Sequence, residues 1–228
     1  DYTDIDSVNT AKTDKKYAAL SGNILSIYNV DENTKYFAGI GKSSRVPDAR
    51  ELYMGANNDL EDTKNYEADL GFDKTIGSFN IKPKLFYSVL KDYIYNSGTF
   101  ENIDAKIYGL DVSGFYFMSE NLSLDYGVAY QKGKKDGNFA DKDLAEIPPL
   151  KANLALNYEH AKSKYTAEIV AVDSWDSFDD SAKEQELAGY ALVNLKYTNQ
   201  LHKNFAITLG MDNLFDKVYN STNTYQDV

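Results

Sequence analysis

The side chains that could act as catalysts or bind a transition metal are few in this sequence. It contains two histidines, His160 and His202, three methionines and no cysteine. A soft copper site needs several methionine, cysteine or histidine ligands that converge, and a hydrolytic site needs a histidine beside a nucleophile or in an HExxH motif. The sequence offers neither arrangement. We therefore expect a protein that is not an enzyme, with no cofactor and no metal site of its own, and we interpret both histidines as solvated turn residues.

A compact set of charged residues lies in the segment RVPDARELYM at 45–54. Arg45, Asp48 and Glu51 have two interpretations: they contact a substrate, or they order the base of a loop through an internal ion pair. Tyr53 and Met54, at the end of this segment, complete the candidate contact set. A single thioether such as that of Met54 cannot form a copper site.

A second charged segment, residues 173–188, is strongly acidic. Lys183 is the one basic residue in this segment. Such a cluster either captures cations at the mouth of a channel and bridges divalent ions to lipopolysaccharide, or it is a solvated, mobile loop. The spacing lacks the D-x-D-x-D-G pattern of a calcium loop, and we expect the solvated loop. The acidic residues are Asp173, Asp176, Asp179, Asp180, Glu184 and Glu186.

The segments around these candidate residues alternate between apolar and polar side chains with a period of two, the pattern of β-strands. The chain of 228 residues is 43% hydrophobic and has 19 tyrosines but four prolines, a composition rich in strand formers. Apolar residues alternate with polar or small ones, as in Leu122–Gln131, so each segment has one apolar and one polar face. The ten strands expected are Lys16–Tyr28, Thr34–Ser44, Tyr66–Asp73, Phe79–Val89, Asp104–Met118, Leu122–Gln131, Leu150–Tyr158, Tyr165–Ala171, Gly189–Tyr197 and Phe205–Met211. Pro83, inside the fourth strand, forfeits one ladder hydrogen bond, a loss that is tolerable at a bulge.

Short and long connections alternate along the chain. Five are short and turn-like, whereas four are long: Arg45–Lys64, Lys91–Ile103, Lys132–Pro149 and Asp173–Ala188. An outer-membrane barrel has this rhythm, with short periplasmic turns and longer extracellular loops. Tyrosines and phenylalanines near the strand ends match its interfacial girdles. The polar residues expected to line the lumen are Lys82, Lys84, Asp125, Lys151, Asn153 and Asn194.

Two other classes of protein compete with the membrane barrel. A soluble antiparallel β-sandwich also alternates, because its apolar face packs against a second sheet. A nucleic-acid-binding protein is excluded, because the net charge of −11 provides no clustered basic residues for a phosphate backbone. The sequence favours the all-β, antiparallel transmembrane β-barrel.

Several segments resemble a known family. They are YFAGIGKSSRVPDARELYM at 36–54, NIDAKIYGLDVSGFY at 102–116, LAEIPPLKANLALNYE at 144–159 and GMDNLFDKVY at 210–219. In this order they are similar to the C-terminal half of a TonB-dependent outer-membrane receptor. The combination of RVPDARE, IDAKIYG and EIPPL is most similar to the copper-receptor branch of that family.

The resemblance implies a 22-stranded barrel with an N-terminal plug domain and a TonB box. Residues 1–228 would then be the C-terminal part of the barrel, about ten strands truncated at both ends, without the plug. It further implies active uptake of a metal ion or metal chelate, copper or a ferric siderophore, across the outer membrane of a Gram-negative cell. The implied partners are TonB, through the missing N-terminal region, and outer-membrane lipid or lipopolysaccharide. A passive porin-like barrel and a soluble β-sandwich binding module remain the alternatives.

Overall fold

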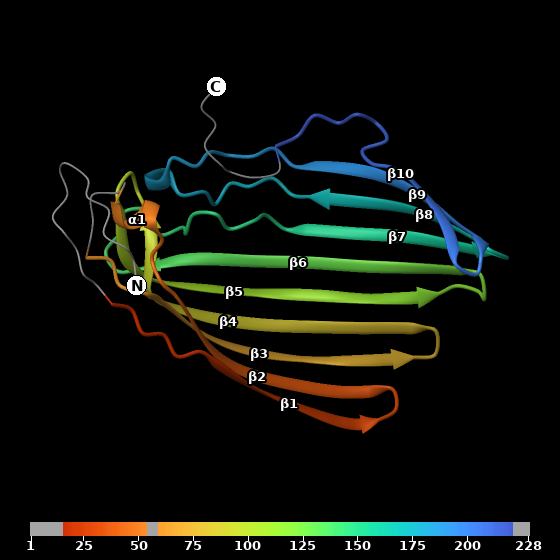
Figure 1. Cartoon of the computed structure of the whole chain (residues 1–228), viewed down its shortest axis with the longest axis horizontal. Helices are drawn as coiled ribbons and strands as arrows, with labels where there is room; N and C mark the ends of the chain where they lie inside the picture. Colours follow the sequence, from red (N-terminus) through yellow and green to blue (C-terminus); the bar gives the residue numbers. More distant parts are fainter. Residues whose placement is uncertain (1–15, 54–58, 221–228) are drawn as a thin grey trace.

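The computed structural model describes residues 16–53 and 59–220, which form one antiparallel sheet. Each strand pairs with the next along the chain, so the sheet is a simple meander from β1 to β10 (Figure 1). The strands are β1 (Gly22–Asp31), β2 (Thr34–Arg45), β3 (Thr63–Ile76), β4 (Phe79–Asn96), β5 (Phe100–Phe117), β6 (Leu122–Asp136), β7 (Lys151–His160), β8 (Ser163–Val172), β9 (Tyr190–His202) and β10 (Phe205–Met211). The helical turns are α1 (Ala49–Tyr53) and η1 (Asp180–Ala182). In the described residues no helix combines the length and apolar character that crossing a membrane requires.

The two ends of the strands differ, as the sequence predicts. At one end, the turn end, adjacent strands are joined by tight connections at 32–33, 77–78, 118–121, 161–162 and 203–204. At the other, the loop end, lie residues 46–53, which include α1, residues 59–62, and the connections at 137–150 and 173–189 (Figure 1). Both histidines are exposed near the turn end, His160 at the end of β7 and His202 at the end of β9.

The predicted long loop at Lys91–Ile103 is wrong. Strands β4 and β5 continue through this segment as a hairpin, and their connection is 97–99. The pairing shifts between Leu90 and Tyr93, a bulge that raises local twist. The extension is strand because Tyr95 and Ile103 are buried against the loops that fold over it. The first strand also differs from its prediction, since it begins at Gly22 rather than at Lys16.

The sheet has one apolar face, and that face is uncovered. Register places Leu70 beside Leu85 and Leu85 beside Leu110, and Leu154 lies beside Ile169. These side chains are among the exposed large hydrophobics, with Leu70 59% and Leu154 43% exposed. No second sheet packs on them within the described residues. The β-sandwich alternative is therefore wrong, because its apolar faces would be pressed together.

Pro83 lies in a continuous strand, and pairing is lost on one side of it, as expected for a proline. It pairs in register with Val112 of β5, while the β3–β4 pairing is interrupted between Gly71–Lys84 and Lys74–Ile81. Proline has no N–H to donate, so the ladder opens on one side only. A Cβ on Gly71 would lie 2.4 Å from the Pro83 carbonyl oxygen and 2.3 Å from the Phe37 ring, so only glycine fits there.

Candidate functional site

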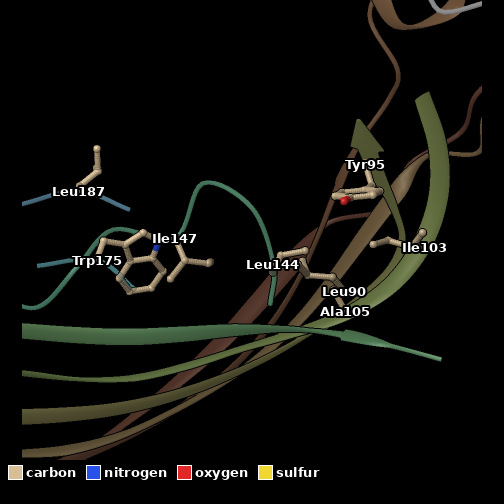
Figure 2. Close-up of a cluster of buried hydrophobic side chains, with 8 residues drawn as sticks. All are labelled: Leu90, Tyr95, Ile103, Ala105, Leu144, Ile147, Trp175 and Leu187. Atoms are coloured by element: carbon tan, nitrogen blue, oxygen red, sulfur yellow. The ribbon is translucent and has the colours of Figure 1, made fainter. Parts of the chain in front are cut away.

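The largest hydrophobic cluster of the described residues lies at the loop end, not along the sheet. The cluster joins the β4–β5 extension, the β6–β7 loop and the β8–β9 loop, and we call this assembly the loop cap. It rests on Ala105, which pairs with Lys135, and on Gly133, which lies between Gln131 and Lys135 on the same face of β6. The two loops therefore fold over the polar face of the sheet. Figure 2 shows the eight buried side chains, Leu90, Tyr95, Ile103, Ala105, Leu144, Ile147, Trp175 and Leu187.

A buried ion pair crosses the loop cap. Lys135 of β6 lies 2.7 Å from Asp179 of the β8–β9 loop, and both side chains are 0% exposed. The Tyr95 hydroxyl donates to the same carboxylate at 2.7 Å, and the Lys135 ammonium lies 4.9 Å from the centre of the Tyr95 ring. Burial, together with Asp179, raises the pKa of the Tyr95 phenol, so it stays protonated and remains a donor.

A second carboxylate fastens the two loops to each other. Glu184 accepts backbone N–H groups from Glu146 at 2.7 Å and from Asp179 at 2.8 Å. Burial raises the pKa of Glu184, whereas these two hydrogen bonds act in the opposite direction. Trp175 and Leu187 close the base of the β8–β9 loop by exchanging backbone hydrogen bonds. The prediction of a solvated, mobile acidic loop is therefore wrong for Asp179 and Glu184, which are buried and paired.

The motif at 45–54 forms a closed set of hydrogen bonds around α1. The Asp48 carboxylate accepts the Glu51 N–H, and the Glu51 carboxylate accepts the Asp48 N–H, both at 2.8 Å. This reciprocal pair is a capping box. The Arg45 guanidinium donates two hydrogen bonds to the Glu51 carboxylate at 2.9 and 2.8 Å. Since Glu51 is largely buried, this fork anchors the helical turn to the end of β2.

A pocket of about 230 Å³ opens between this motif and the loop cap. Arg45, Asp48 and Glu51 line it from one side, and Tyr93 and Glu184 from the other. Tyr53 ends α1 and packs against a small cluster of Leu52, Leu60 and Ile94 rather than into the pocket. Met54 lies outside the described residues. In the described ranges, no three histidine, aspartate or glutamate side chains converge as a metal site.

The six residues predicted to line a lumen all lie on the polar face. This follows from register: Lys82 and Lys84 pair with Ser113 and Asp111, and none of the six shares the face of Leu70, Leu85, Leu110 and Leu154. Several are paired along the sheet. Lys84 lies 3.4 Å from Asp69, Asp125 accepts from Asn157 at 2.8 Å, and Asn194 donates to Glu168 at 2.9 Å. Lys151 and Asn153 occupy the start of β7 on the same face.

Sequence reasoning missed the residues that hold the loop cap together. Lys135 and Asp179 are 44 positions apart, so no local pattern connects them. Two signals were present. The segment KDYIYN at 91–96 is rich in strand formers, and the only tryptophan, Trp175, falls in a predicted loop.

The chain is similar to proteins of known class. A family model described as "TonB dependent receptor-like, beta-barrel" matches residues 1–214. "Vitamin B12 transporter BtuB" of Photobacterium profundum is 26% identical over 235 residues, which cover 96% of this chain and 38% of that protein. "Hemoglobin-binding protein A" of Haemophilus influenzae is 26% identical over 144 residues, covering 53% of this chain and 14% of its own length. The chain thus spans less than two fifths of these relatives.

Solved structures share the fold. "Copper transporter OprC" superposes with a TM-score of 0.78 at 24% identity, over 88% of this chain and 34% of that one. The FrpB iron transporter from Neisseria meningitidis superposes with a TM-score of 0.70 at 18% identity, over 89% of this chain and 35% of that one. The exposed apolar face, the alternating turns and loops and the family match together lead to one assignment. The chain belongs to the TonB-dependent receptor family, as part of a β-barrel of the Gram-negative outer membrane.

Proposed function

We propose that this chain is part of the barrel wall of a receptor that actively takes up a metal ion or metal chelate. The supporting observation is the loop cap, which is folded over the polar face and fixed by the buried Lys135–Asp179 pair. A cap held in this way shapes the outer mouth of a barrel and leaves a polar pocket beside it. Copper is our first candidate cargo, because of the RVPDARE, IDAKIYG and EIPPL segments, and a ferric siderophore is the second.

The candidate contact residues divide by position. Arg45, Asp48 and Glu51 border the mouth pocket and would meet a substrate or plug there. Tyr53 and Met54, at the end of the same motif, complete this proposed set. The residues proposed to face a plug domain inside the lumen are Lys82, Lys84, Asp125, Lys151, Asn153 and Asn194.

The remaining proposals concern the whole receptor. Residues 1–228 would form the C-terminal part of its barrel, and TonB would act through a region outside this chain. Uptake against a gradient requires this energy input, because a barrel by itself only permits diffusion. Passive diffusion through a porin-like barrel is the second candidate function. The polar inner face is the one observation that favours it.

Uptake measurements distinguish active uptake from passive diffusion through a porin. Cells with the gene deleted should lose high-affinity accumulation of radioactive copper or of a radioactive ferric siderophore, and cells lacking TonB should show the same loss. A plasmid copy of the gene should restore uptake in the first strain only. If accumulation depends on the gene but continues without TonB, the protein is a porin and the proposal is wrong.

A further inference from the structure

The mouth pocket, the cavity of about 230 Å³ beside the loop cap, draws its walls from four segments. They are α1 with the end of β2, the β4–β5 extension, the β6–β7 loop and the β8–β9 loop. Pockets that enclose a whole drug-sized ligand measure roughly 300–1,000 Å³. A metal chelate with several donor arms is at least drug-sized, so this pocket admits one arm of it and leaves the metal core outside.

Most charged side chains of the pocket are already paired within the fold. The two carboxylate oxygens of Glu51 accept hydrogen bonds from Arg45, and those of Glu184 each accept a backbone N–H. The Asp48 carboxylate accepts the N–H of Glu51. These groups shape the walls, and they offer a ligand few free hydrogen-bonding positions.

Three polar side chains of the lining residues have no hydrogen bond or ion pair within the described part of the chain. They are the Glu146 carboxylate of the β6–β7 loop, the Tyr93 hydroxyl of the β4–β5 extension and the Arg50 guanidinium of α1. Each belongs to a different segment, so only the folded arrangement of the loops brings them to one cavity. They are the groups through which the pocket can bind a ligand.

The backbone holds Glu146 in place from both sides. Its N–H donates to Glu184 at 2.7 Å, and the next side chain, Ile147, is buried in the loop cap. Its φ of +62° lies in the left-handed region, which residues other than glycine adopt uncommonly. The carboxylate thus extends from a fixed backbone, and a group presented in this way binds a ligand with little loss of conformational freedom.

The electrostatic potential at the Tyr93 hydroxyl is negative. Burial is the main cause that raises the pKa of this phenol, and the carboxylates of Glu146, Glu51 and Glu184 raise the pKa further. The Arg45 guanidinium acts in the opposite direction. Three negative groups against one positive group favour a cation at this point of the pocket.

We infer that the mouth pocket recognises an alkylammonium arm of a metal chelate. The inference rests on the proposed function, since it names the class of cargo that this same site admits. The ammonium group donates hydrogen bonds to the Glu146 carboxylate and to the Tyr93 oxygen, and the Arg50 guanidinium meets an anionic donor oxygen of the chelate core. The metal keeps the donor atoms of the chelate, because the pocket is too small for the core.

Two ferric chelates that differ only in the arm test this inference. Ferrioxamine B bears one alkylammonium arm, and its N-acetyl derivative bears a neutral amide at the same position. Equilibrium dialysis with radioactive iron measures their dissociation constants for the full-length gene product in detergent. We expect ferrioxamine B to bind about tenfold more tightly, a ratio that corresponds to one charge-assisted hydrogen bond.

Two single variants locate the effect. Glu146→Gln removes the charge without breaking a hydrogen bond or ion pair of the described residues, and it should lower the ratio to about twofold or less, as expected for a neutral hydrogen bond. The matched control Glu186→Gln removes the same charge from an exposed position of the β8–β9 loop outside the pocket, and its ratio should equal that of the unchanged protein. Heat-modifiable gel mobility checks that both variants are folded.

Four results would overturn the inference. Two of them concern the unchanged protein: equal binding of the two chelates, and a failure of both to bind. A ratio that survives in Glu146→Gln would show that Glu146 does not contact the arm. A ratio lost equally in Glu186→Gln would show a general attraction of cations to an acidic protein. Each of these results leaves the proposed function standing, because the dependence of uptake on TonB decides that function separately.

Discussion

Replacing Lys135 by methionine should destabilise the closed loop cap by about 3–5 kcal/mol, because it leaves the Asp179 carboxylate buried without its countercharge. Both side chains are 0% exposed, so water cannot compensate. The amides of Trp175 and Leu187, which hydrogen-bond to each other's carbonyls, report the opening. In the full-length product, their hydrogen exchange should become about 10²- to 10³-fold faster, or more.

Two further variants test whether the effect of K135M comes from the unpaired buried charge of Asp179. The double variant K135M/D179N removes both charges and should recover much of the lost protection, since a neutral pair no longer leaves an unpaired ion. The control K91M breaks the Lys91–Asp104 pair, whose side chains are 49% and 39% exposed, and should cost less than about 1 kcal/mol. Unchanged exchange at Trp175 and Leu187 in K135M would mean that the ion pair does not hold the cap.

Replacing Leu154 by arginine should lower the free energy of unfolding in lipid vesicles by about 2–4 kcal/mol. Leu154 lies near the middle of β7, on the apolar face between Tyr126 and Ile169. A guanidinium there would have to leave water for hydrocarbon. Urea titration of the full-length product in vesicles measures the change.

The neighbouring position supplies the matched control for Leu154. Asn153 lies on the polar face of the same strand, so Asn153→Arg keeps its charge in a water-filled interior and should have a small effect. If both arginines destabilise the barrel equally, the apolar face does not meet lipid.

The strands and their faces could be predicted from the sequence because their cause is local. Successive side chains point to opposite faces, so Leu154 and Asn153 separate whatever the rest of the chain does. The alternation of turns and loops could be read as well, except at Lys91–Ile103, and it correctly indicated which end carries the long connections.

The loop cap could not be predicted, because its cause is not local. In sequence, Asp179 is one of several acids in a polar stretch, and Lys135 follows another lysine. Only the folding of two loops over the β4–β5 extension brings these charges together and removes them from water. The same contacts turn the predicted loop at Lys91–Ile103 into paired strand.

The motif at 45–54 lies between these cases. The spacing of Asp48 and Glu51 is that of a capping box, so an internal role was visible in the sequence. The fork from Arg45 to Glu51 depends on the angle at which the chain leaves β2, which the sequence does not reveal.

The central claim is that the apolar face of this sheet meets lipid while the polar face meets water. Spin labels placed singly at Leu124, Leu154, Asp125 and Asn153 of the membrane-embedded full-length product test it most directly. Collision with dissolved oxygen should dominate relaxation at Leu124 and Leu154, and collision with a water-soluble nickel chelate should dominate at Asp125 and Asn153. The opposite pattern would contradict the orientation of the sheet, and with it the assignment of lumen and lipid surfaces.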